Sequence, residues 1–406
     1  MTRTYSEFHN RGTLIAASAL GLSAGMTATL FYSLGTFISL LQAEFGWSHS
    51  EISFAVTIMT LGMFVSGTAV GRICDRFGAG LVGAFSLIAY AVGVVVMVAV
   101  TGSVHMFWLM YFVIAILGIG STPIVMIRPI TAAFRKSRGF ALGIALTGAG
   151  IAGFWVPNMV AMVSTSYGWR GAYLALAAIA VIISPLVYFG FREIDKRAKD
   201  GNTDNPGLLD IQTGLSSKEA RATREFWLLT AIAFTMASGI AGIVVHLTPM
   251  LVDEGVTLID AARIASIIGL ASVIGRVVIG LLLDKYPAAL VALTVLGLSA
   301  LGIFLLWSSG AQFVILSAIL IGLAAGAEVD FLAYLTALHF GQLNYGTIYG
   351  WQYSVFALGY GIAPLSVGIL RDIAGDYQIA LILSGIFVLI ASLLMLGLRH
   401  NPKFSV

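Results

Sequence analysis

Charged residues are scarce in this chain, and that scarcity excludes an ordinary soluble globular protein. Asp, Glu, Lys and Arg make up 10% of the 406 residues, whereas hydrophobic residues make up 59%. Average soluble domains carry about 25% charged residues, and the mean hydropathy of this chain is +0.96. A soluble core could not bury this much apolar surface, so we expect an integral membrane protein in contact with a lipid bilayer.

Cysteine is nearly absent as well. The single cysteine, Cys74, excludes a disulfide within the chain and a metal site built from several cysteines. No phosphate loop, paired Cys/His set or Ser-His-Asp arrangement stands out. No strand precedes the glycine-rich run 143–153, so its glycines favour close helix packing and not a nucleotide site. We therefore expect neither an enzyme nor an ATP-driven pump, with no cofactor, no metal and no nucleic-acid partner.

Long apolar segments are what the chain has in place of these features. Segments of about 20 residues, the length of a bilayer-spanning helix, recur from end to end, and the alternation typical of a membrane β-barrel is absent. With both termini in the cytoplasm, most Lys and Arg lie on that side, which favours an even number of spans. The sequence predicts an all-α protein whose twelve spans lie at about 13–41, 51–71, 81–101, 106–130, 139–164, 171–191, 226–251, 261–283, 288–308, 311–339, 346–370 and 377–398.

One long polar segment divides these spans into two sets of six. We predict an N-terminal half at 1–192, a cytoplasmic linker at 193–224 and a C-terminal half at 225–406. Within the linker, Ser216 and Glu219 resemble a capping box, which predicts a short helix. The halves are similar at an offset of about 208 residues, and such parallel repeats place a binding site between the halves near the midplane, with alternating access by rocking.

Two sequence stretches at the cytoplasmic ends of spans show this repeat. Span two ends in Gly71-Arg-Ile-Cys-Asp75-Arg76-Phe-Gly78, and span eight ends in Gly280-Leu-Leu-Leu-Asp284-Lys285. The first resembles the loop 2–3 signature of the major facilitator superfamily, although Ala79-Gly80 replaces the usual trailing basic pair. The resemblance covers nearly the whole chain and implies the major facilitator fold. It also implies that Asp75, Arg76 and the matching Asp284 form a conformational latch with no substrate contact.

A narrower resemblance is to the bacterial monocarboxylate porter and oxalate/formate antiporter group. It rests on Glu44-Phe-Gly-Trp47 before span two, on the stretch 134–145 before span five and on the arginine of span eight. It implies a multi-pass protein of a bacterial inner membrane with both termini cytoplasmic. We expect such a porter to function as a monomer.

Arg276 is the strongest candidate for chemistry, because it lies about 12 Å along a helix from the charged end of its span. A charge at such depth costs about 2.5–3.5 kcal/mol on insertion scales, so it needs a buried polar or charged partner or a water-filled cavity. In the related porters the span-eight arginine binds the substrate carboxylate, and a guanidinium offers a planar fork for that group. The competing interpretation is a structural ion pair with Glu328 or Asp330.

Two differences from the related porters bear on the substrate. The aspartate that eukaryotic monocarboxylate porters place one turn before this arginine is Ser272 here, and the span-eleven lysine of oxalate porters is missing. Both favour a monoanion or a different second cation. Arg128 is a candidate second cation, or it snorkels toward the cytoplasmic boundary. Further candidates for substrate contact are Tyr32, Gln352 and Tyr353, although aromatic residues in spans are often packing or interfacial residues.

Proton coupling has three candidates in the second half. Glu328 and Asp330 lie two residues apart, about 200° around a helix, so both cannot face one cavity. Asp330 shares its face with Gly326 and Tyr334, which favours it as the cavity-facing residue. His246 could titrate near neutral pH, but a lone helical histidine near a proline is more often a structural hydrogen-bonding residue.

These observations predict a secondary active transporter of a small organic anion, with a monocarboxylate as the preferred class, coupled to protons. One alternative is a proton-driven exporter of a drug-like or cationic compound, with Glu328 or Asp330 binding the cation and Arg276 tuning their pKa values. An anion exchanger is another. A non-transporting membrane sensor or scaffold is the alternative from a different class, and net flux would exclude it.

Overall fold

The computed structural model describes residues 11–134, 138–199, 214–283, 285–341 and 343–398. Over these ranges the chain consists of helices joined by short connections, and its one β-type pairing is an isolated bridge between Gly214 and Gly341. The predicted all-α class is confirmed. Eleven described helices are long and apolar enough to cross a membrane.

The count of eleven rather than twelve has a local cause. Helix α9 (Arg138–Lys199) contains the two predicted spans 139–164 and 171–191, and its direction changes at Gly168, where the backbone has φ 64° and ψ −173°. A positive φ of this size is readily adopted only by glycine. The bend divides α9 into two arms of spanning length, so the described helices provide the twelve predicted spans.

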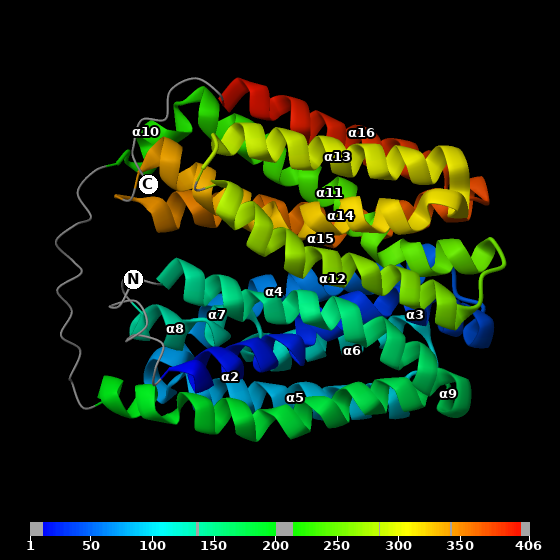
Figure 1. Ribbon diagram of the computed structural model, residues 1–406. Coiled ribbons are helices and arrows are strands. Elements are labelled where there is room, and N and C mark those ends of the chain that lie inside the picture. The colour runs from blue at the N-terminus through cyan, green and yellow to red at the C-terminus, as the bar shows by residue number, and fades with distance from the viewer. Residues whose placement is uncertain (1–10, 135–137, 200–213, 284, 342, 399–406) are drawn as a thin grey trace. The chain divides into compact units, whose positions relative to one another are not determined.

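The chain divides into two compact units. Unit 1 comprises residues 1–203 with 257–266, and unit 2 comprises 204–256 with 267–406. The sequence-based boundaries at 192 and 225 stay a prediction. Unit 1 contains α2 (Gly12–Ser23), α3 (Met26–Phe45), α4 (His49–Phe77), α5 (Ala79–Val100), α6 (Val104–Gly118), η1 (Ile119–Ser121), α7 (Pro123–Met126), α8 (Arg128–Ala133) and α9 (Figure 1).

Unit 2 is built from longer uninterrupted helices, and the first turns of α12 are grouped with unit 1. Its elements are α10 (Ser217–Arg221), α11 (Arg224–Asp253), α12 (Leu258–Leu283), α13 (Ala288–Ser309), η3 (Gly310–Phe313), α14 (Val314–Phe340), α15 (Tyr345–Ala374), α16 (Gln378–Leu394) and η4 (Met395–Leu398).

The spans predicted at 13–41 and 106–130 are present in unit 1, but the helix of each is interrupted. The first breaks between α2 and α3, where Gly25 is extended, and the fourth breaks at η1 and again at Ile127. Hydrogen bonds through Ser121 connect the two interrupted regions. The Met26 N–H donates to Ser121 Oγ at 2.9 Å, and Ser121 Oγ donates to the Gly118 carbonyl. The corresponding first and fourth spans of unit 2, α11 and α14, are continuous.

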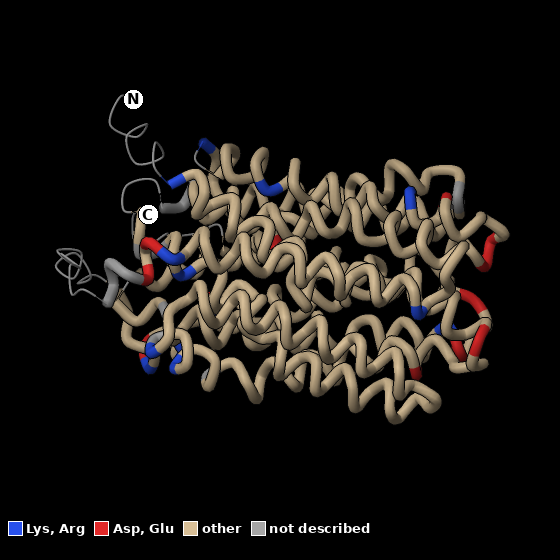
Figure 2. Tube along the Cα trace, turned by 90° about the horizontal axis from the view of Figure 1, so that it is seen from below, with Lys and Arg blue, Asp and Glu red and all other residues tan. Residues whose placement is uncertain are grey.

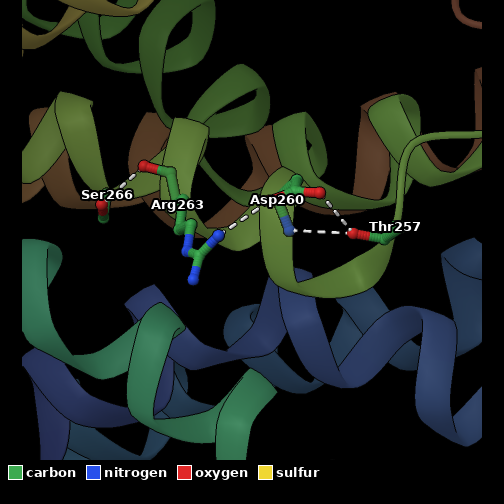
Figure 3. A network of polar contacts seen from close by, with 4 residues as sticks. All are labelled: Thr257, Asp260, Arg263 and Ser266. Atoms are coloured by element: carbon green, nitrogen blue, oxygen red, sulfur yellow. Dashed lines mark hydrogen bonds and ion pairs between the residues drawn. The ribbon is translucent and has the colours of Figure 1, made fainter.

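Side-chain caps define several helix starts. The predicted capping box of Ser216 and Glu219 is confirmed and begins the short helix α10. Hydrogen bonds from the Ser216 backbone N–H and side chain hold the pKa of Glu219 below its ordinary value. Helix α12 begins with a comparable network, in which Thr257 bonds the Asp260 backbone and carboxylate and Asp260 pairs with Arg263 at 3.0 Å (Figure 3).

Charged residues concentrate at the ends of the helices, with few along their middles (Figure 2). Each unit has an ion pair that joins its first span to the region between its fifth and sixth spans. In unit 1 Arg170 contacts Glu44 at 2.7 Å, and in unit 2 Arg371 contacts Asp253 at 2.9 Å. Each arginine also lies over an aromatic ring, Trp169 or Tyr377. The repeat seen in the sequence therefore extends to side-chain contacts.

Candidate functional site

Arg276 lies in the C-terminal half of α12 and contacts two groups on α14. Its Nε–H donates to the Gly326 carbonyl oxygen at 3.0 Å, and Nε lies 3.2 Å from Asp330 Oδ2. The side chains of Arg276 and Asp330 are 17% and 31% exposed, so the pair is largely but not completely buried. Gly326 and Asp330 are one turn apart on the same face of α14, which presents a neutral and an anionic acceptor to one guanidinium.

A seam of glycines brings these two helices together. A Cβ on Gly322 would lie 2.6 Å from the Ile268 carbonyl oxygen, and a Cβ on Gly275 would lie 2.6 Å from that of Leu323. Glycines four residues apart let two helix backbones approach closely in a membrane. The seam thereby sets the rotation of α14 that turns Asp330 toward α12.

Glu328 lies outside this pair. Its side chain is 3% exposed, and no described residue hydrogen-bonds its buried Oε1. The 200° separation expected from the sequence accounts for this, because α14 presents Asp330 to Arg276 and Glu328 to another side. A buried carboxyl group without a partner is costly to ionise, so Glu328 is chemically distinct from its near neighbour.

Helix α15 adds a stripe of aromatic side chains. Tyr345, Tyr349, Tyr353, Phe356 and Tyr360 follow one another with ring centroids 5.4–5.9 Å apart. Of these side chains, Tyr353 is 42% exposed.

Gln352, on the same helix, is fully buried, and its amide N–H donates to the Phe226 carbonyl of α11 at 3.1 Å. Its Oε1 has no hydrogen-bond partner among the described residues. The side chain is therefore directed at the α11 backbone.

His246 is enclosed by partners of its own unit. Nε2 lies 2.9 Å from the Pro364 carbonyl oxygen and Nδ1 lies 3.2 Å from the Tyr377 hydroxyl, and the ring is fully buried. A carbonyl only accepts, so Nε2 carries a proton, and in the neutral ring Nδ1 then accepts from the Tyr377 hydroxyl. This arrangement joins α11 to α15 and to the residue preceding α16.

The remaining predicted contacts lie in unit 1. Arg128 donates to the Gly71 carbonyl of α4 at 3.2 Å, at the start of the stretch that resembles the loop 2–3 signature. Tyr32 packs edge-on against Phe31 at 5.5 Å. Neither observation tests a substrate contact, so both stay predictions.

The latch residues are only partly described. Arg76 is exposed and lies over the Phe77 ring at 5.3 Å. The side chain of Asp75 and the whole of Asp284 lie outside the described residues. Next to the latch, Asp195 at the end of α9 accepts the backbone N–H groups of Ala79 and Gly80, at 3.0 and 2.8 Å. Backbone donors thus occupy the place of the missing basic pair.

Sequence reasoning missed the Gly326 carbonyl as a partner of Arg276. The available signal was the pair Gly322 and Gly326 at helical spacing, together with Gly275 beside the arginine. Within the described ranges, no three His, Cys, Asp or Glu side chains are grouped closely enough to hold a metal ion.

Comparisons with known proteins agree with this architecture. The sequence model of the Major Facilitator Superfamily matches residues 20–364, and also 264–405. The chain is 26% identical to Monocarboxylate transporter 12 of Xenopus laevis over 67% of its own length and 65% of the relative. It is 25% identical to Monocarboxylate transporter 11 of Homo sapiens over 95% and 83%. The chain thus spans less than two thirds of the Xenopus relative.

Two solved structures share the fold. A bacterial homologue of the human lysosomal transporter Spinster, inward-facing and unoccupied, aligns with a TM-score of 0.71 over 97% of this chain and 99% of that one. A D-xylose–proton symporter aligns with a TM-score of 0.72 over 96% and 98%. At 16% and 15% identity these likenesses show the fold alone, and they confirm the predicted fold class.

Proposed function

Because the chain belongs to the Major Facilitator Superfamily, we propose that it is a secondary active porter for a small monocarboxylate, which it moves with a proton by alternating access. The chain is a multi-pass membrane transporter and not an enzyme. The proposal adds the substrate class, the coupling ion and the residues that bind each of them.

The contact between Arg276 and Asp330 carries this proposal. The contacts of the guanidinium with Gly326 and Asp330 both use Nε, and its two terminal nitrogens, Nη1 and Nη2, have no hydrogen bond to a described residue. A carboxylate fits that edge with two parallel N–H···O bonds. The substrate anion then binds beside Asp330 instead of displacing it from Arg276.

Charge balance explains why a proton accompanies the anion. Arg276 and ionised Asp330 together are neutral, and a bound monoanion leaves one net negative charge within the span. A charge at that depth costs about 2.5–3.5 kcal/mol on insertion scales. Protonation of Asp330 restores neutrality, which predicts one proton for each monoanion.

The sequence differences from related porters agree with this assignment. Ser272 occupies the place of the aspartate one turn before the arginine, and its hydroxyl donates within its own helix to Gly269. Asp330 supplies the missing carboxylate from α14. The absence of a lysine in α15 favours a monoanion, and the names of the relatives support a monocarboxylate.

A proton-driven exporter of a cationic compound is the second candidate. The observation in its favour is Glu328, a buried carboxyl group whose Oε1 has no partner among the described residues. We favour the first candidate because the arginine that faces Asp330 has an edge suited to an anion. An anion exchanger would use the same edge without a net proton.

The proposed setting is the inner membrane of a bacterium, with both termini in the cytoplasm and a single chain as the functional unit. The excess of Lys and Arg in the loops assigned to the cytoplasm supports this orientation.

Uptake into proteoliposomes tests the proposal. We expect labelled lactate, propionate or benzoate to enter proteoliposomes of the wild-type protein faster when the lumen is alkaline. Arg276→Ala should reduce this uptake at least about 30-fold, as loss of one partner of a charge pair costs roughly 2–5 kcal/mol. The matched control is Arg263→Ala, an exposed arginine on the same helix, which keeps wild-type uptake. Unchanged uptake by Arg276→Ala would contradict the site.

A further inference from the structure

We propose that Gly326 is a positioning residue for Arg276, whose carbonyl fixes the edge that the guanidinium presents to substrate. The inference rests on the proposed function, since it concerns the same anion site. Gly326 has no side chain beyond hydrogen and no charge, so the residue type alone does not indicate this role.

The first step is the closeness of α14 to α12. A Cβ on Gly326 would lie 2.8 Å from Ser272 Cα and closer still to the Ser272 carbonyl oxygen, inside the 3.0 Å that real Cβ atoms keep. The obstacle is backbone, which cannot turn aside as a flexible side chain does. Any larger residue must therefore push the two helices apart.

The second step is the bond that this closeness allows. The Gly326 carbonyl accepts from Arg276 Nε at 3.0 Å, so the glycine that tolerates the approach also supplies the acceptor. A Cβ on Gly322, one turn earlier on α14, would also lie within 3.0 Å of α12, at 2.6 Å from the Ile268 carbonyl oxygen and 2.7 Å from Ala271 Cβ, but the Gly322 carbonyl supplies no hydrogen bond to the arginine. Gly326 therefore has a second function that Gly322 lacks.

The third step concerns the transport cycle. Asp330 changes its charge when it takes up a proton, whereas a backbone carbonyl remains an acceptor at every pH. The Gly326 carbonyl holds Nε in both states, so the Nη1–Nη2 edge keeps its direction when Asp330 is neutral. A fixed planar fork favours a carboxylate, which engages both nitrogens.

Nitrogen NMR of the detergent-solubilised full chain with 15N-labelled arginine tests this without any substrate. The Arg276 Nε–H resonance is assigned by its loss in Arg276→Lys. We expect it to be protected from solvent exchange in the wild type at pH 5 and 7.5, and also in Asp330→Asn. In Gly326→Ala the exchange should be at least about 10-fold faster, since a hydrogen bond to a charged group is lost.

Two glycine variants separate positioning from packing. Gly280→Ala on α12 has nothing within 4 Å of the new Cβ and should leave the Nε–H exchange unchanged. Gly322→Ala disturbs the same seam and should accelerate the exchange less than Gly326→Ala does. Equal acceleration in the two seam variants, or full protection in Gly326→Ala, would overturn the inference.

Lactate uptake then connects the bond to transport. We expect Gly326→Ala to raise KM for lactate about 10-fold with a smaller change in kcat, because orientation of the fork affects binding first. Wild-type KM in Gly326→Ala would refute the positioning role. If wild-type protein moves no carboxylate, the proposed function fails, while the NMR result still decides whether Gly326 positions the arginine.

Discussion

At the scale of residues, two carboxyl groups lie two positions apart on α14 but have different surroundings. Asp330 meets a guanidinium and is partly exposed, whereas Glu328 is buried and its Oε1 has no partner among the described residues. The proposed porter needs one group that binds and releases a proton as the anion arrives. Contact with Arg276, the proposed anion-binding residue, favours Asp330 for that task.

Charge-neutral substitutions distinguish the two carboxyl groups. One pH unit is worth about 1.4 kcal/mol, so a coupled porter accumulates a monoanion about 10-fold across such a gradient. We expect Asp330→Asn to equilibrate lactate without accumulating it, because the coupling proton has no site. Glu328→Gln should accumulate lactate as the wild type does. Accumulation by Asp330→Asn, or its loss in Glu328→Gln, would reverse the assignment.

The sequence indicates which residues are candidates but not which contacts they make. Arg276 stands out because a charge inside an apolar span is costly, and helical periodicity shows that Glu328 and Asp330 diverge. The choice between them depends on the rotation of α14, which the glycine seam sets through contacts with α12. Gln352 and His246 likewise stay ambiguous in the sequence, because each bonds a backbone carbonyl that is distant along the chain.

At the scale of elements, unit 1 differs from unit 2 in having interrupted first and fourth spans. Hydropathy locates both spans but not the breaks within them, because it reports the apolarity of side chains and is insensitive to backbone angles. Gly25 and Pro123 were the only local signals, and either residue also occurs inside transmembrane helices. Within unit 1 the breaks depend on one another through Ser121, which satisfies the first N–H of α3.

Removal of the Ser121 hydroxyl should destabilise the junction between α2 and α3. Ser121→Ala leaves the buried Met26 N–H without its acceptor, which costs about 1–3 kcal/mol. We expect a lower unfolding temperature and faster hydrogen–deuterium exchange in peptides that contain residues 25–28. Ser33→Ala is the matched control, because Ser33 is equally buried and bonds only within α3. Equal exchange in the two variants would show that Ser121 does not support the break.

At the scale of the whole molecule, composition already requires a membrane protein, and the repeat indicates two related halves. The ion pairs Glu44–Arg170 and Asp253–Arg371 extend that repeat to the ends of the helices in each unit. The orientation of the helices across the bilayer comes from the Lys and Arg distribution alone and calls for a direct measurement.

Cysteine labelling measures that orientation. Cys74 is buried and is the only cysteine of the chain, so Cys74→Ala provides a cysteine-free background. Lys218 and Glu254 lie beyond opposite ends of α11, whose 30 residues extend about 45 Å. In intact bacterial cells we expect a membrane-impermeant maleimide to label Glu254→Cys at once and Lys218→Cys only after permeabilisation. The inverse pattern would place the termini outside, and labelling of both in intact cells would mean that α11 does not cross the membrane.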